Sequence, residues 1–215
     1  KTAAIYGAFI PNPMHVYRTA GVLAGLGLSY GGATTEEDVV GLIFADQGID
    51  LSKISGDIKI VSYLQGYGDT TTDEINAAIQ AAPEAFISVG MATTFFTQQL
   101  NAAGIEFSDI DSFTKSNGEA ITNGKLVYLA GKYSSSVGPA FALVMNAING
   151  NVIRDAQGNA VSLSQNYQVA TDSETFDKFY KNDNGDNPIY SRDTLDQIIG
   201  DTVTFDTINE VVASN

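Results

Sequence analysis

The chain contains no cysteine and no tryptophan, a single histidine, and 11 basic residues against 25 acidic ones. Without cysteine the protein can form no disulfide, no thiol nucleophile and no thiolate metal site. The formal net charge of −14 repels phosphate backbones and anionic membrane surfaces, so we expect no nucleic-acid partner. No apolar run approaches the roughly 20 residues that a membrane-spanning helix needs.

With 215 residues, the chain is long enough to bury a core as one large domain or two small ones. Its hydrophobic share of 44% is typical of a globular protein. The chain opens on a strand-like segment, so no signal peptide is expected within it. The absence of cysteine is compatible with any compartment, but together with the ten tyrosines, the lack of tryptophan and the many Asn, Thr and Ser residues it mildly favours an exported protein.

Predicted strands and helices alternate along the first 150 residues. Runs of small, β-branched or alternating apolar residues predict strands at 2–10, 58–64, 85–89, 111–114 and 126–130. Helices are predicted at 14–26, 36–46, 71–82, 93–103 and 137–148, with a further short helical segment ending at 123. Capping patterns at Asn12, at Thr34 with Glu37, and at Thr71 with Glu74 support three of these helices. This alternation predicts a parallel sheet with helices on both faces.

The character of the chain changes after residue 150. The expected elements are, in order, a hairpin turn at 155–159 (DAQGN), a short strand at 167–170, a helix at 173–180, a polar loop at 181–188, and two helices capped by Ser191 and Thr204. This part has too few strands for a sheet of its own. We therefore expect it to dock either on the first domain or on a part of the protein that is missing from this chain.

Catalytic and metal-binding patterns are sparse. His15, in the first turn of the first predicted helix, is either a ligand contact or general base, or a partly exposed helix residue. Two Gly-Lys pairs, at 124–125 and 131–132, lack the earlier glycine and the following hydroxyl residue of a phosphate loop. The acidic loop at 183–186 fails the spacing of a calcium site, and no G-x-S-x-G sequence occurs. We expect no enzyme activity, no cofactor and no metal.

The order of the elements carries a family resemblance in three segments. In the first, a strand ending in Tyr-Gly at 6–7 leads to a helix with Arg18 three residues before a glycine. The second is AFISVGMATTFFTQQLNAAG at 85–104, and the third is the NGKL strand with a helix ending in N-x-x-x-G at 146–150. In this order, the chain resembles the second half of a type I periplasmic solute-binding protein, the sugar-binding family of ABC import systems. The closing helices SRDTLDQIIG and TFDTINEVVA are similar to those of the family.

The resemblance implies an α/β fold with a parallel, doubly wound sheet. Residues 1–131 would form the second lobe, and residues 132–215 the crossover and the C-terminal part of the first lobe. The main sheet of the first lobe would be absent, so one apolar face of the helix at 137–148 would lack its cover. That face consists of Val137, Phe141, Val144, Met145 and Ile148. We expect this region either to dimerise or to bind a partner that supplies the missing lobe.

The resemblance also implies a ligand cleft at the carboxyl ends of the strands. Arg18 matches the family's cleft arginine, whose planar fork binds hydroxyls or a carboxylate; otherwise it is a surface arginine paired with an acid. The family's Asn-Asp pair falls on Val89 and Gly90, its next aspartate falls near Phe113, and its crossover amide falls on Lys132. These departures remove contacts that ordinary hexose or pentose binding would use, and the more apolar wall with Arg18 and Lys132 instead suits an anionic or partly aromatic solute. The implied ligand-binding residues are Arg18, His15, Gly90, Phe113, Thr114 and Lys132.

The predicted function is capture of a small molecule by an extracytoplasmic solute-binding protein that serves the membrane permease of an ABC transporter. The protein would be periplasmic, or held at the cell surface by a lipid anchor on an N-terminus that has been removed or is missing. One alternative is a doubly wound α/β enzyme acting at the carboxyl ends of the strands. The absence of a convergent nucleophile and base argues against it. Another is a sensor or interaction module that kept the lobe and lost the ligand, which Val89 and Gly90 favour.

Overall fold

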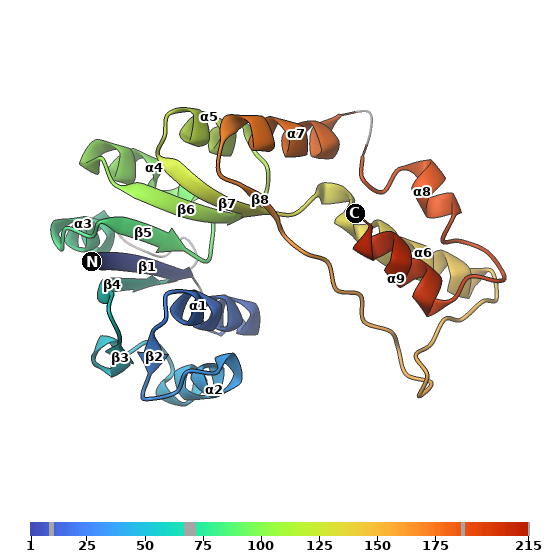
Figure 1. Ribbon diagram of the computed structural model, residues 1–215, viewed down its shortest axis with the longest axis horizontal. Coiled ribbons are helices and arrows are strands. Elements are labelled where there is room, and N and C mark those ends of the chain that lie inside the picture. The colour runs from blue at the N-terminus through green and yellow to red at the C-terminus, as the bar shows by residue number, and fades with distance from the viewer. Residues whose placement is uncertain (9–10, 67–71, 186–187, 215) are drawn as a thin grey trace. The chain divides into compact units, whose positions relative to one another are not determined.

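The computed structural model describes residues 1–8, 11–66, 72–185 and 188–214. The chain forms two compact units (Figure 1). The first unit contains residues 1–111, 115–129 and 171–173. The second contains residues 112–114, 130–170 and the described residues from 174 onwards. Among the described residues, no helix has both the length and the apolar character needed to cross a membrane.

A six-stranded sheet organises the fold, as Figure 1 shows. In order across the sheet, the strands are β4 (Lys59–Gln65), β1 (Thr2–Ala8), β5 (Ala85–Ser88), β6 (Glu106–Asp111), β7 (Leu126–Gly131) and β8 (Gln168–Ala170). β1 pairs in parallel with both β4 and β5, and β5 pairs in parallel with β6. Helices lie between most consecutive strands in the sequence, so the predicted parallel α/β sheet is confirmed.

Helices cover both faces of the sheet in the first unit. They are α1 (Pro13–Gly25), α2 (Glu36–Asp46), α3 (Thr72–Gln80), α4 (Ala92–Ala103), α5 (Lys115–Thr122) and the short η1 (Leu51–Lys53), beside a small sheet of β2 (Ser29–Tyr30) and β3 (Ile54–Ser55). On one face, Ile5 of β1 belongs to the same apolar cluster as Leu23 of α1 and Ile43 of α2. Because side chains alternate along a strand, Tyr6 reaches the opposite face. There its ring lies 4.8 Å from the ring of Phe96 on α4.

Capping hydrogen bonds fix the first two helices. Asn12 accepts a hydrogen bond from the backbone of α1, as predicted. α2 is capped one residue later than predicted, by Thr35 instead of Thr34. The backbone N–H of Asp38 donates to Thr35 Oγ1 at 3.3 Å, and the Thr35 hydroxyl donates to the Asp38 carboxylate at 2.6 Å. An aspartate thus takes the place of the predicted glutamate, and it bonds the side chain of the cap residue. The predicted cap Thr71 lies outside the described residues.

The fourth predicted strand is displaced. β6 runs from Glu106 to Asp111, whereas the predicted strand at 111–114 is wrong, because residues 112–114 leave the sheet and belong to the second unit. The buried positions of β6 are Phe107 and Asp109. Alternation is therefore present, but one of its inward residues is an acid. A strand of this kind is missed when strands are predicted from runs of apolar residues.

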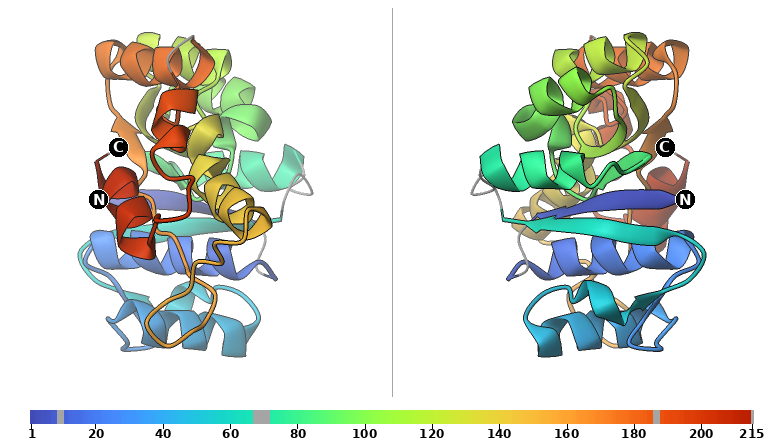
Figure 2. Two further views of the ribbon diagram at one scale, coloured as in Figure 1. Left: turned by 90° about the vertical axis from the view of Figure 1, so that its right-hand side faces the viewer. Right: turned by 90° about the vertical axis from the view of Figure 1, so that its left-hand side faces the viewer.

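The second unit is a group of helices around a small apolar core. They are η2 (Ser134–Val137), α6 (Gly138–Ile148), α7 (Ser173–Asn184), α8 (Arg192–Asp196) and α9 (Phe205–Ala213). Ala142 of α6 shares an apolar cluster with Ile208 of α9, and both helices can be followed by their colours in Figure 2. The fully buried amide of Asn146 donates to the carbonyl of Ile198 at 2.8 Å and accepts from the N–H of Gly200 at 2.8 Å. These bonds tie α6 to the segment after α8.

Two predictions for the second unit are wrong. The DAQGN segment does turn, with the N–H of Gly158 donating to the carbonyl of Asp155 at 3.0 Å, but no described strand flanks it and no β-hairpin forms. α7 continues to Asn184, through the first half of the predicted polar loop. Its last turn is held because the Asp183 carboxylate accepts a hydrogen bond from the backbone N–H of Ser134. A contact between distant segments thus overrides the local polar composition.

Candidate functional site

Arg18 lies at the carboxyl end of the parallel sheet in the first unit. From α1, its Nη1 donates to the carbonyl of Val89, just after β5, at 3.1 Å. The guanidinium also bonds both carboxylate oxygens of Asp111 at the end of β6, at 2.7 and 3.3 Å. The exposed fractions of the two side chains are 9% and 22%. This bidentate pair is mostly buried but still reaches solvent through the aspartate.

Asp111 is the site residue that the sequence did not single out. It is the last residue of β6 and has a φ of 93°, a left-handed conformation that costs a non-glycine residue roughly 1–3 kcal/mol. The bonds from Arg18 compensate this strain. The resemblance placed the missing family aspartate near Phe113, whereas a carboxylate occupies the edge just before that position. The sequence signal that could have identified Asp111 is its position as an acidic residue at the end of β6, a strand in which buried and more exposed residues alternate.

The turn after β5 brings backbone groups to the same edge. Ser88 Oγ donates to the carbonyl of Gly90 at 2.7 Å and accepts from the N–H of Gly90 at 3.1 Å. Both residues are buried, as is the side chain of Val89. Gly90 therefore lies in a compact, internally bonded turn. Its main contribution to the edge is to fix the Val89 carbonyl that Arg18 contacts.

Asp109 holds the start of α4 at this edge. Its carboxylate accepts from the backbone N–H groups of Ala92 and Thr93, at 2.8 and 3.2 Å, and from the amide of Asn117 at 3.0 Å. Met91, the residue at the cap position, makes no side-chain cap bond, so Asp109 takes over the capping role from a neighbouring strand. Burial raises the pKa of Asp109, and these hydrogen bonds oppose the rise. The Asp109 carboxylate is therefore engaged in hydrogen bonds that hold the fold together.

His15 lies on α1 one turn before Arg18, and residues three apart share a helix face. The interpretation as a partly exposed residue is wrong, because only 4% of His15 is exposed. Its backbone carbonyl accepts a hydrogen bond from Thr19 at 2.9 Å. His15 is thus a buried residue of α1 that lies about one helical turn before Arg18.

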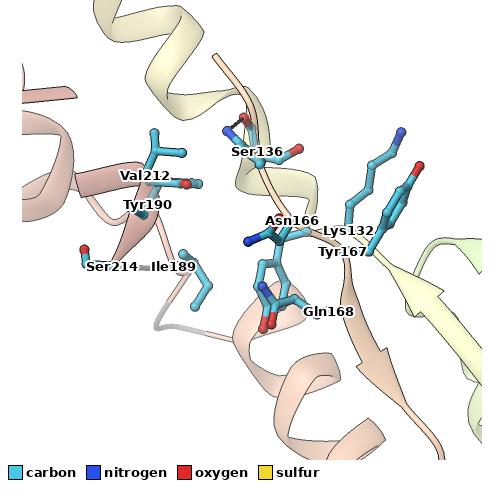
Figure 3. Close-up of a pocket in the computed structure, with 12 residues that line it drawn as sticks. Lys132, Ser136, Asn166, Tyr167, Gln168, Ile189, Tyr190, Val212 and Ser214 are labelled. Atoms are coloured by element: carbon cyan, nitrogen blue, oxygen red, sulfur yellow. Dashed lines mark hydrogen bonds between the residues drawn. The ribbon is translucent and has the colours of Figure 1, made fainter. Parts of the chain in front are cut away.

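The second unit contains a pocket of about 420 Å³ (Figure 3). Its lining is mostly neutral and polar, with amides, hydroxyls and phenols. It consists of Lys132, Tyr133, Ser136, Gln165, Asn166, Tyr167, Gln168, Ile189, Tyr190, Val212, Ala213 and Ser214. Tyrosine phenols are protonated donors at neutral pH, and burial raises the pKa of Tyr133 and of Tyr190 further. The Gln165 amide is already engaged with the carbonyl of Ser136, at 2.9 Å.

Lys132 lines this pocket at its margin. In Figure 3 its side chain extends alongside that of Tyr167, away from Tyr190 and Val212. Lys132 is exposed, and its side chain lies at the rim of the pocket and does not point into it. The pocket is therefore suited to hydrogen bonding with a polar molecule more than to holding an anion.

The other two predicted site residues also lie in the second unit. Phe113 is 3% exposed, and its ring packs against Tyr133, Phe176 and Phe179, with centroids 5.4–6.0 Å away. Its ring is thus occupied by packing. Thr114 is exposed. Of the six predicted residues, His15, Arg18 and Gly90 belong to the first unit, and Phe113, Thr114 and Lys132 to the second.

The described residues contain no group of three His, Cys, Asp or Glu side chains positioned to hold a metal ion. Comparison with protein-family models and with curated proteins found no match to this chain. The chemistry of the site therefore has to be judged from its own groups. Those groups are a guanidinium, a carboxylate and a backbone carbonyl at one edge of a parallel sheet, and they can donate to and accept from a polar ligand.

Proposed function

We propose that this chain is part of an extracytoplasmic solute-binding protein of the type I periplasmic class, and that it captures a small neutral polyhydroxyl solute such as a sugar. The protein would present this solute to the permease of an ABC transporter. Two things support the proposal: the order of the motifs along the sequence, and a parallel α/β sheet with polar residues at its carboxyl edge. Open α/β sheets bind ligands at that edge.

The observation that carries the proposal is the Arg18–Asp111 pair. A sugar hydroxyl can donate to a carboxylate oxygen and accept from a guanidinium N–H, and this pair fixes both groups a hydrogen bond apart. Asp111 keeps 22% of its side chain exposed, so it can receive a ligand hydroxyl without leaving Arg18. The backbone of Val89 and the bonds within the turn after β5 hold the geometry in place.

The same pair favours a neutral solute over the anionic one that the departures from the family pattern suggested. The positive charge of Arg18 is compensated by a carboxylate at 2.7 Å. An anionic ligand would have to compete with Asp111 for the guanidinium and would meet its negative charge. The second expected cation, Lys132, belongs to the other unit. A ligand with hydroxyls and no charge uses both members of the pair and disturbs neither.

The test is a thermal-shift and calorimetric screen of the chain with neutral pentoses and hexoses, alongside gluconate and galacturonate. A solute at about 100 times its Kd stabilises the protein by about 2.7 kcal/mol, which for a chain of this size raises the Tm by roughly 5–10 °C. We expect such shifts for one or more neutral sugars and none for the sugar acids. Shifts with the acids alone would contradict the assignment of a neutral solute.

Asp111→Asn, which keeps the shape of the side chain, should weaken binding of that sugar by about tenfold or more, since a hydrogen bond to a charged group is worth about 1.5–3 kcal/mol. Asp57→Asn is the matched control, because Asp57 is exposed in the same unit. Circular dichroism would show that both variants remain folded. Equal affinities for wild type and Asp111→Asn would place the binding site elsewhere.

A further inference from the structure

α6 presents an uncharged apolar face that no other described part of the second unit covers. The helix has no acidic or basic residue. Three large side chains on one side of α6, together with that of the N-cap residue, are widely exposed: Phe141 (51%), Val144 (57%), Ile148 (71%) and, at the cap, Val137 (68%). The opposite side is occupied, since Ala142 and Asn146 are fully buried in the core of the second unit. One side of α6 thus holds the unit together, and the other remains free for contact with another molecule.

The spacing of the exposed side chains fits contact with another helix. The steps between them are four, three and four residues, the pattern of a heptad seam, which places all four in one narrow stripe. Exposed alanines at 140 and 147 lie on one flank of the stripe, seven residues apart. Small residues on the flank let a second backbone approach closely. A stripe of this kind is complementary to itself when the partner helix is related by a twofold axis.

We propose that this face is a dimerisation surface, on which α6 packs against α6 of a second copy of the chain. From their exposed fractions, the four side chains offer roughly 400 Å² per copy, as large as the main apolar patch of a typical monomer. Two copies with their flanking residues would bury about 1,000 Å², the lower limit for a specific interface. The dimer is therefore weak and reversible. It does not use the residues of the first unit on which the proposed solute binding rests. The first lobe that the family resemblance implies would cover the same face, so a longer chain that contains this lobe and stays monomeric assigns the face to the lobe and overturns the dimer.

The net negative charge of the chain explains why two copies would contact each other through this face. Each copy carries a net charge of −14, so two copies repel one another over most of their surfaces. The uncharged α6 face is where contact carries no direct charge repulsion. Added salt screens the remaining repulsion and strengthens burial of apolar surface. Self-association should consequently increase with ionic strength, opposite to the behaviour of an assembly held by ion pairs.

The test is analytical ultracentrifugation over a concentration series at low and at high ionic strength. We expect a monomer–dimer equilibrium that shifts toward dimer in salt. Phe141→Asp should weaken it by about tenfold or more, because it places two carboxylates in the contact. Phe44→Asp is the matched control, since Phe44 is 41% exposed on α2. A wild-type chain that stays monomeric at every concentration overturns the proposal, and so does equal loss of dimer in both variants.

Cross-linking locates the contact independently. The chain has no cysteine, so a single introduced thiol reports only its own surroundings. Val144→Cys, near the middle of the stripe, should form disulfide-linked dimers under mild oxidation, and Phe44→Cys should remain monomeric. If the two variants cross-link equally, the chain associates without using α6, and the assignment of this surface is refuted.

Discussion

Replacing Asn146 with alanine should destabilise the second unit by about 2–4 kcal/mol. The amide is fully buried and bridges two backbone groups, the carbonyl of Ile198 and the N–H of Gly200, each at 2.8 Å. Removing it leaves an acceptor and a donor without these partners inside the protein, and each such buried group costs about 1–3 kcal/mol. The methyl group of alanine can replace neither bond. The loss should appear as faster and easier unfolding of the α6–α9 core.

Urea unfolding, followed by far-ultraviolet circular dichroism and by tyrosine fluorescence, measures this change. The ten tyrosines and the absence of tryptophan make tyrosine emission readable. Asn149→Ala is the control, because Asn149 is exposed just after the same helix and its replacement should change stability by less than about 0.5 kcal/mol. If Asn146→Ala unfolds within about 0.5 kcal/mol of wild type, the bridge contributes little and the reasoning is refuted.

Asn146→Asp adds a pH test of the same bridge. One carboxylate oxygen can still accept from Gly200, but the other faces the carbonyl of Ile198 and repels it unless it is protonated. The pKa of this aspartate should therefore be raised in the folded protein, and protonation should favour folding. The stability deficit relative to wild type should shrink as the pH is lowered from neutrality toward about 4, the usual pKa of aspartate. A deficit that does not change with pH would show that the carboxylate has escaped to solvent.

Three further outcomes can be measured by the same unfolding assays. Gly131→Ala should cost about 1–3 kcal/mol, because its Cβ would lie 2.4 Å from the ring of Phe113, which is packed and cannot move aside. Tyr30→Phe should cost about 1–3 kcal/mol, since the buried phenol donates to Asp46 at 2.6 Å. Hydrogen bonds from Lys53 hold the pKa of Asp46 below its usual 3.8, so its contribution is present above that pH and lost below it. In Asp46→Asn this part of the acid sensitivity should disappear.

The elements that the sequence predicted well are those whose signals are local. The strand at 85–89 has a continuous apolar pattern. The helix at 36–46 has apolar residues at helical spacing and a cap residue directly before it. Ser191 and Thr204 were predicted as caps, and each accepts the expected backbone hydrogen bond. Signals of this kind depend on residues three or four apart, so one sequence is enough to read them.

The site was harder to predict because its geometry depends on distant partners. Arg18 and Asp111 are 93 residues apart, and only the pairing of β1, β5 and β6 brings them to one edge. Asp109 caps a helix that begins 17 residues earlier, so no pattern near α4 reveals it. Arg18 was found because it belongs to a recognisable segment, whereas its partner ends a strand that was missed. Polar inward positions remove the apolar alternation on which strand prediction relies.

The overall charge of the chain bears on the solute as directly as the site does. A protein with a net charge of −14 lowers the local concentration of anions and leaves neutral molecules unaffected. At the sheet edge, the positive charge of Arg18 is compensated by the carboxylate of Asp111. The site therefore does not attract anions against the negative potential of the whole protein. Binding of a neutral sugar should then be almost independent of ionic strength, whereas binding of a sugar acid should strengthen as salt screens the repulsion. Calorimetry of the bound solute at low and high salt separates the two cases. A steep loss of affinity with added salt would mean that an uncompensated positive charge meets the ligand, and the proposed role of the Arg18–Asp111 pair would be wrong.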